Sequence, residues 1–166
     1  MLGGVLVTGT VAAAAASTTG SGSQFGIQIG ALFPNTGDAR FLGGQTQLSA
    51  GLNYNFASGS GSTPTASDLY FDFLNGSNNG GYLHSGGLGV QLRTIGRGFL
   101  GAGLGLYNTA VRDPDGMSGN VTGAGGKVFA GLGLGGGSSV ELDYHIMPST
   151  MGVNPSGLGV EFGFHL

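Results

Sequence analysis

The chain has 166 residues and a formal charge of −3, and only 8% of its residues are charged. This length fits one domain, and a hydrophobic content of 40% argues against a disordered chain even though 38 residues are glycine. The absence of cysteine excludes disulfide scaffolds and thiolate metal sites, and five scattered basic residues provide no stripe for binding nucleic acid.

Residues 1–16 are small and apolar, and they end in an alanine run before a polar stretch. This pattern indicates the end of an export signal, although no basic residue precedes Arg40. A short buried helix or an additional strand is the alternative. We assign residues 17–23 to a linker and residues 24–166 to the folded domain. No later apolar run approaches the roughly eighteen residues that a transmembrane helix needs.

Eight segments of the folded domain alternate apolar residues with glycine, amide or charged residues. This two-residue period is that of a β-strand with one oily face and one polar face. The last segment shows it clearly, because Val160, Phe162 and Phe164 alternate with small or polar residues. The eight predicted strands are 24–33, 45–56, 68–73, 87–93, 99–106, 127–134, 139–146 and 158–166. The even number of strands predicts an all-β fold, an eight-stranded antiparallel up-and-down transmembrane β-barrel.

The links between these strands differ in length, as they do in outer-membrane barrels, where short periplasmic turns alternate with longer external loops. The long links, which we expect to be external, are 34–44, 108–126 and 148–156. The tight links lie around 95–98 and 135–138. Two links depart from the alternation: 57–66 is too long for a periplasmic turn, and 75–81 is compact where an external loop is expected.

All charged residues within the predicted strands lie in the polar phase: Asp68, Asp72, Arg93, Lys127, Glu141, Asp143 and Glu161. A charge facing the bilayer midplane would cost about 2–4 kcal/mol, whereas a charge facing the lumen finds water or a partner. We therefore expect a lumen charge network in which Arg93 and Lys127 pair with some of the acids. An eight-stranded barrel is only wide enough for its own side chains, so we expect a plug and not an open pore, with inward glycines making room for Tyr70, Phe99 and Phe129.

The chemistry of the polar phase indicates which face of the strands meets lipid. A soluble, lipocalin-like binder of small ligands would show the same period, but its exterior would be rich in Lys, Glu and Thr. Here the polar phase is mostly Gly, Ser, Asn and Gln, which favours the membrane barrel. The aromatic residues expected as anchors at the membrane interfaces are Tyr54, Tyr107, Tyr144 and Phe164.

The run Gly159-Val160-Glu161-Phe162-Gly163-Phe164 resembles the glycine and aromatic signature that ends outer-membrane barrels and that the barrel-assembly machinery reads. Over residues 24–166 the chain resembles small barrels of the OmpA and OmpX type in length, strand number and polar interior. The resemblance implies an outer-membrane location and contact with outer-membrane lipid and lipopolysaccharide. It also implies a structural or surface-interaction role through external loops. We expect a monomer that is not an enzyme and has no cofactor and no nucleic-acid partner.

One enzymatic alternative rests on His145, Ser149 and Glu161, which resemble the His, Ser and Glu set of the lipid A deacylases, themselves eight-stranded barrels. A hydrolase needs its base within hydrogen-bond reach of its nucleophile. In that family the serine follows the histidine by two residues, whereas here the gap is four and Pro148 intervenes. Because His145 shares the lumen phase with Asp143, a structural hydrogen bond explains it more simply.

Metal sites have weak support in the sequence. Asp113 and Asp115, with Ser118 and Asn120, could offer oxygen ligands to a calcium ion on the longest external loop. Turn chemistry around Asp115 is the favoured interpretation of this loop. The histidines are too dispersed to predict a zinc site, and the pair His84-Ser85 is expected at the surface.

Overall fold

The computed structural model of the protein describes residues 25–60 and 62–166, so the predicted export signal (1–16) and linker (17–23) lie outside the described residues. Within them, eight antiparallel strands close into a barrel in chain order. The strands are β1 (Phe25–Pro34), β2 (Gln47–Gly59), β3 (Thr65–Asn78), β4 (Gly81–Thr94), β5 (Gly98–Arg112), β6 (Ser118–Gly135), β7 (Ser138–Ile146) and β8 (Gly157–His165). The predicted all-β, eight-stranded antiparallel barrel is confirmed.

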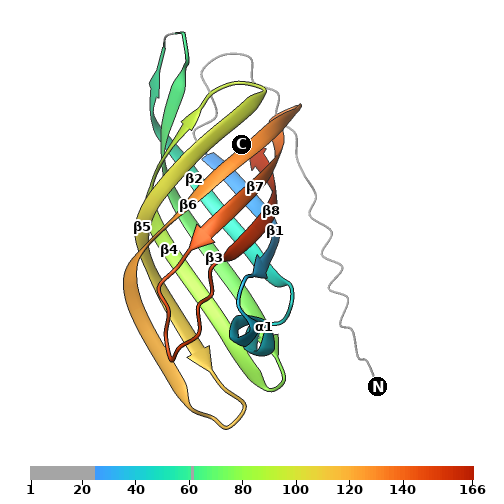
Figure 1. The fold of residues 1–166 in the computed structure, drawn as a ribbon. Helices are drawn as coiled ribbons and strands as arrows, with labels where there is room; N and C mark the ends of the chain where they lie inside the picture. Colours follow the sequence, from blue (N-terminus) through green and yellow to red (C-terminus); the bar gives the residue numbers. More distant parts are fainter. Residues whose placement is uncertain (1–24, 61) are drawn as a thin grey trace.

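Pairing of the first strand with the last closes the barrel. Ile29 of β1 lies opposite Ala50 of β2 on one side and opposite Phe162 of β8 on the other. Every strand therefore has two hydrogen-bonded neighbours, and the sheet has no free edge. Figure 1 shows the strands tilted across the barrel wall, as closure requires.

The strand faces are arranged inside out relative to a water-soluble barrel. Large apolar side chains point outward over the middle of the wall, with Leu104 75% and Leu132 57% exposed. The alternating positions point inward, and in the middle of the lumen they carry buried charges such as Lys127 and Glu161. In the middle of the barrel the strands therefore do not enclose the apolar interior that a lipocalin-like binder would need.

A short helix, α1 (Gly37–Gly43), covers the end of the barrel away from the C-terminus (Figure 1). The Thr36 hydroxyl accepts a hydrogen bond from the Ala39 backbone at the N-terminus of the helix, and Gly44 ends it with φ +90°. Ala39 and Leu42 of α1 pack with three buried residues of the surrounding wall and loop: Leu83, Val111 and Val153. No helix among the described residues is long and apolar enough to cross a membrane.

Four strands run further toward this end than their apolar alternation predicts. The expected link 75–81 is mostly strand, with the turn at Asn79 and Gly80, and the expected loop 108–126 shrinks to residues 113–117. At the opposite end the link between β2 and β3 covers residues 60–64, less than the predicted 57–66. The hairpins β3–β4 and β5–β6 thus extend the wall around α1.

The extended strands reverse their polarity without a break. On β5 the outward side chains change from Leu104 and Leu106 to Asn108, while Thr109 and Val111 are buried inward. The β4–β5 and β5–β6 registers are continuous through this point, so no bulge rotates the strand. The outward positions stop being apolar here because the surroundings of the two faces of the wall change, and not because the strand ends.

Candidate functional site

The candidate site is the lumen charge network, the set of predicted residues Asp68, Asp72, Arg93, Lys127, Glu141, Asp143 and Glu161. Strands β3, β4, β6, β7 and β8 supply them, and the two-residue period of each strand points them to the same side of the wall. All except the partly exposed Arg93 are buried. Closure of the barrel brings residues more than 100 positions apart in sequence, such as Ser49 and Glu161, into contact in the lumen.

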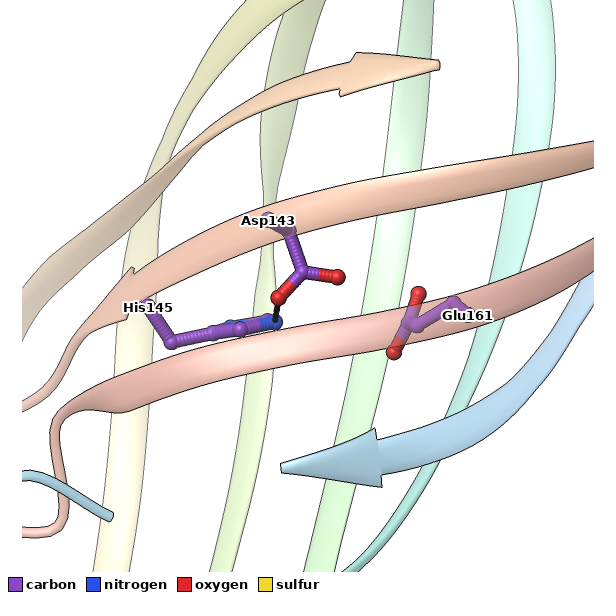
Figure 2. A group of neighbouring side chains, drawn as sticks. All are labelled: Asp143, His145 and Glu161. Carbon is purple, nitrogen blue, oxygen red and sulfur yellow. Dashed lines mark ion pairs between the residues drawn. The ribbon is translucent and has the colours of Figure 1, made fainter. Parts of the chain in front are cut away.

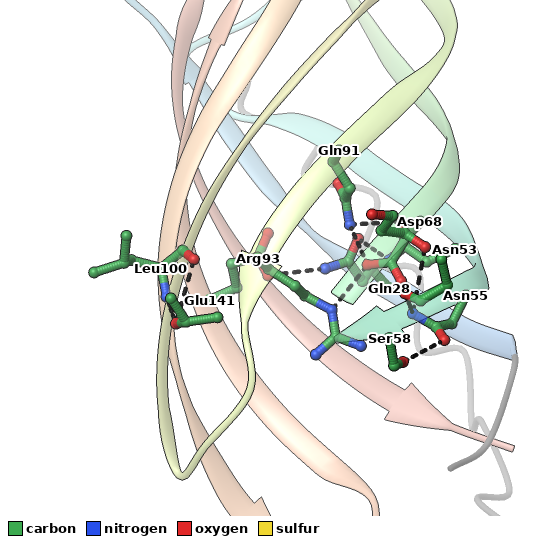
Figure 3. A network of polar contacts seen from close by, with 12 residues as sticks. Gln28, Asn53, Asn55, Ser58, Asp68, Gln91, Arg93, Leu100 and Glu141 are labelled. Atoms are coloured by element: carbon green, nitrogen blue, oxygen red, sulfur yellow. Dashed lines mark hydrogen bonds and ion pairs between the residues drawn. The ribbon is translucent and has the colours of Figure 1, made fainter. Parts of the chain in front are cut away.

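A first cluster surrounds Asp68 near the end of the barrel that carries the C-terminus (Figure 3). The Arg93 guanidinium donates through Nε to Asp68 Oδ2 at 2.8 Å, and Gln91 donates to the same oxygen at 3.2 Å. Asn55 donates to Asp68 Oδ1 at 2.7 Å. Both carboxylate oxygens therefore have charge-assisted or amide partners, and this acid is fully compensated.

An amide chain extends this cluster across the lumen. Asn53 Nδ2 donates to Gln28 Oε1 at 2.9 Å, and Gln28 Nε2 donates to Glu141 Oε2 at 3.1 Å. Neither amide belongs to the predicted network, yet both lie in the polar phase of their strands, which was the signal that could have found them. Beside these amides lies a small pocket, lined among others by Gln28, Asn53, Asp68 and Glu141, which we call the vestibule. Its volume of about 30 Å³ is enough for a few water molecules at most.

A second cluster surrounds Asp72 in the middle of the lumen. Lys127 Nζ donates to Asp72 Oδ1 at 3.0 Å, and the Tyr107 hydroxyl donates to Asp72 Oδ2 at 3.0 Å. The Lys127 ammonium also lies 4.6 Å from the centroid of the Tyr70 ring and 5.7 Å from that of Phe129. The single charge of Lys127 is thus held by one carboxylate and two aromatic faces.

A third group lies on β7 and β8 and holds the remaining acids, Glu141, Asp143 and Glu161, beside His145. Asp143 Oδ1 is 3.1 Å from His145 Nε2, an ion-pair distance without the alignment of a hydrogen bond. Glu161 Oε1 accepts a hydrogen bond from the Ser49 hydroxyl. The imidazole of His145 lies at ion-pair distance from Asp143 and near Glu161, and this part of the lumen has more acidic than basic groups.

One of the four aromatic assignments is wrong. Tyr107 is fully buried in the lumen, where its hydroxyl needs a polar partner and finds Asp72, so it is not an interface anchor. The other three, Tyr54, Tyr144 and Phe164, are partly exposed. The ring centroids of Tyr54 and Phe25 lie 4.9 Å apart in a tilted arrangement, and the Tyr144 hydroxyl accepts a hydrogen bond from Asn35 at 2.6 Å.

The expected surface pair His84-Ser85 is also wrong in part. Ser85 is buried and lies 3.2 Å from the Thr109 hydroxyl across the β4–β5 pair, whereas His84 is partly exposed and its ring lies 4.6 Å from that of Tyr82. Adjacent residues of a strand face opposite sides of the wall, so a neighbouring pair cannot share one surface.

Of the candidate catalytic residues, His145 and Glu161 lie close together in the lumen, but Ser149 does not join them. His145 is fully buried in the lumen, whereas Ser149 is exposed on the loop after β7. His145 lies beside two aspartates, with Nε2 near Asp143 and Nδ1 3.8 Å from Asp72. The arrangement places the imidazole in an acidic surrounding and not next to a hydroxyl nucleophile.

The weak calcium candidates lie on the β5–β6 turn. Asp113 Oδ1 accepts a hydrogen bond from the Met117 backbone at 2.8 Å, and Gly116 provides the positive φ of +89° that the turn needs. Asp115 is exposed at the same turn, while Ser118 and Asn120 belong to β6. The carboxylate of Asp113 therefore serves the turn.

A scan against models of known protein families found no match to this chain, and a search of curated proteins found no relative.

Proposed function

We propose that the protein is an outer-membrane β-barrel whose lumen is filled by side chains and which has a structural or surface-interaction role at the cell surface. The observation that carries the proposal is the reversal of polarity along unbroken strands. Outward positions are apolar over the middle of the wall and polar beyond it, while inward positions change in the opposite sense. A wall surrounded by water along its whole length would have no reason to change in this way.

The height of the apolar band supports a bilayer as its surroundings. On β6 the small or apolar outward positions run from Ala124 to Leu134. At about 3.3 Å per residue and a tilt near 40°, this stretch covers roughly 25 Å along the barrel axis, which is the height of the apolar band in known transmembrane barrels. Outward leucines such as Leu88, Leu100 and Leu106 are each more than half exposed within the band.

The placement of aromatic side chains is consistent with two membrane interfaces. Tyr54 and Phe164 lie on β2 and β8 toward the end that carries the C-terminus, and Tyr144 lies on β7 near the α1 end. Aromatic rings at both edges of the apolar band are typical of transmembrane barrels. The strand β8, which carries the terminal aromatic signature, is the segment that we propose the assembly machinery binds.

The surface role is assigned to the α1 end, which we propose faces outward from the cell. Asn78 and Asn79 of the β3–β4 hairpin both donate to the Phe41 carbonyl of α1 at 3.1 Å. Asn108 donates to Thr122 at 2.9 Å across the β5–β6 hairpin. Side-chain hydrogen bonds thus hold the β3–β4 hairpin to α1 and the two strands of the β5–β6 hairpin to each other, and an ordered surface of this kind loses little conformational entropy when it binds a partner.

Single-tryptophan variants test the membrane proposal, because the chain contains no tryptophan. Leu104→Trp places an indole on the apolar band, and Met117→Trp places one at the exposed tip of the β5–β6 hairpin. In vesicles of brominated phosphatidylcholine we expect strong quenching of Leu104→Trp and little quenching of Met117→Trp. Equal fluorescence of Leu104→Trp in brominated and unbrominated vesicles would contradict the proposal.

A gel assay provides the control for folding in both variants. Closed barrels without a free edge keep their shape in detergent until they are heated, so unheated and heated samples should migrate differently. Fractionation of cells should place the unmodified protein with the outer membrane. Recovery of a folded, heat-modifiable barrel in the soluble fraction would argue for the soluble alternative.

A further inference from the structure

The lumen contains more buried acids than its buried and half-buried bases can neutralise. Arg93 pairs with Asp68, and Lys127 pairs with Asp72. The acids Glu141, Asp143 and Glu161 remain, and among residues 25–60 and 62–166 the basic groups that face them are Lys127, already bound to Asp72, and His145. Glu141 and Glu161 are direct cross-strand partners, a like-charge pairing that destabilises a sheet unless something compensates for it.

Several atoms of this group have no hydrogen-bond partner within the described part of the chain. They are both carboxylate oxygens of Asp143, both ring nitrogens of His145, Oε2 of Glu161 and Oε1 of Glu141. Asp143, His145 and Glu161 are 2%, 0% and 1% exposed, so bulk water does not satisfy them. Asp143 Oδ1 and His145 Nε2 face each other at ion-pair distance, and the remaining atoms need a proton, a water molecule or an ion as a partner.

Three of these four side chains lie close together in the lumen. One ligand atom from each of Asp143, His145 and Glu161 can be chosen so that all three lie within 4.8 Å of one another. Figure 2 shows the two β7 side chains and the β8 carboxylate directed toward each other in the lumen. Asp143 and His145 are two residues apart on one strand, and the β7–β8 register brings Glu161 beside them.

Glycines on the neighbouring strands make the space that the group occupies. A Cβ atom at Gly159, which pairs with Asp143 across β7 and β8, would overlap the Asp143 carboxylate. A Cβ atom at Gly30 of β1 would overlap the β8 backbone at Val160 and Glu161, so this glycine allows a close approach of the two strands. The Asp143 carboxylate can lie close to the wall only because Gly159 has no side chain.

We propose that Asp143, His145 and Glu161 form a binding site for one divalent transition-metal cation of the zinc type. Two carboxylates and one imidazole are ligands that zinc accepts, whereas magnesium and calcium prefer sets made of oxygen alone. A dication would offset excess negative charge and would bind one atom of each of these three side chains. Glu141 lines the vestibule at the C-terminal end of the barrel and lies opposite Glu161.

The site is independent of the proposed membrane role, because it requires only the folded barrel. The test uses the folded protein in detergent with His84→Gln and His165→Gln, which leave His145 as the single histidine. We expect this background variant to retain about one equivalent of zinc after desalting, measured by elemental analysis. Zinc should raise its thermal unfolding midpoint, and magnesium and calcium should not.

Asp143→Asn and His145→Gln in this background remove one ligand each, and Ser149→Ala is the matched control on the exposed loop. We expect at least a tenfold loss of zinc affinity in the first two and no change in the control. Heat-modifiable migration shows whether each variant is folded. The visible spectrum of the cobalt-loaded background variant should be that of a site with nitrogen and oxygen ligands.

Three results would overturn the proposal. The first is a folded background variant that retains no stoichiometric zinc, which would mean that the acids are satisfied by shared protons instead. The second is zinc affinity unchanged in folded Asp143→Asn or His145→Gln. The third applies if both of these variants fail to fold. It is an oxygen-only shell in the X-ray absorption spectrum of the zinc-loaded background variant, which would exclude His145 as a ligand.

Discussion

Lys127 and Arg93 each pair with one aspartate, but they differ in their exposure to water. The side chains of Lys127 and Asp72 are 1% and 3% exposed, whereas that of Arg93 is 22% exposed. Removal of one partner from a fully buried pair costs about 3–5 kcal/mol, because the other charge is left uncompensated. Loss of a hydrogen bond to a charged group costs about 1.5–3 kcal/mol, and Asp68 keeps its bonds to Asn55 and Gln91.

We therefore expect Lys127→Met to lower the free energy of unfolding in detergent more than Arg93→Met, with urea titration of the folded barrel as the measurement. The double variant Lys127→Met/Asp72→Asn should recover part of the loss, because it also removes the Asp72 charge that Lys127→Met leaves without a partner. Equal losses for the two single variants, or no recovery in the double variant, would contradict the buried ion pair as the source of stability.

Neighbouring glycines of β4 test how the wall accommodates its plug. A Cβ atom at Gly87 would overlap the Tyr107 ring, whereas a Cβ atom at Gly86 would meet nothing within 4 Å. Neither residue has a positive φ. We expect Gly87→Ala to cost about 1–3 kcal/mol by overpacking the lumen. Gly86→Ala should be neutral or stabilising by about 0.4–1 kcal/mol, since it restricts only the unfolded chain.

Urea titration of both variants in detergent gives the comparison, and each serves as the control for the other. The two glycines lie on opposite faces of one strand, so the same substitution should change the free energy of unfolding by a different sign or size at each. A loss at Gly86→Ala as large as that at Gly87→Ala would mean that strand flexibility, and not room for Tyr107, explains the glycine.

The alternation within single strands predicted the barrel and the inward charges. The apolar or polar character of each residue indicates which face of the wall it occupies, and this can be judged without knowing the neighbouring strands. It did not predict the strand extensions, since beyond Leu106 the apolar phase moves from the outward to the inward face. It also missed α1, whose seven residues are too few to show a helical period. Tyr107 shows the same limit of single-strand patterns. Its position in the alternation is an inward one, but only closure of the barrel brings Asp72 within hydrogen-bond distance of its hydroxyl.

The convergence of Asp143, His145 and Glu161 could not be predicted from spacing along the chain. Asp143 and His145 share a strand, but Glu161 joins them only through the β7–β8 register. Its orphan oxygen becomes evident only when the partners of every nearby acid are known. The histidine that looked too isolated for a metal site therefore gains its significance from cross-strand neighbours.

At the scale of the whole molecule, the lumen has three layers along the barrel axis. Amides and the Asp68–Arg93 pair lie toward the C-terminal end, charged and aromatic groups fill the middle, and an apolar layer lies under α1. A second apolar cluster, with Leu74 and Met147 beside Tyr70 and Tyr107, joins the middle to the α1 end.

This layering predicts that the protein carries no steady ion current across planar lipid bilayers. Tyr70, Tyr107, Lys127, His145 and Glu161 are each at most 2% exposed, so water does not line the middle of the lumen. Deletion of α1 should not open a path, because the middle layer does not depend on the helix. Tyr70→Ala/Tyr107→Ala removes two rings from that layer and should admit a measurable leak. A steady conductance from the unmodified barrel, absent from protein-free bilayers, would show that the plug moves and that the lumen is a channel.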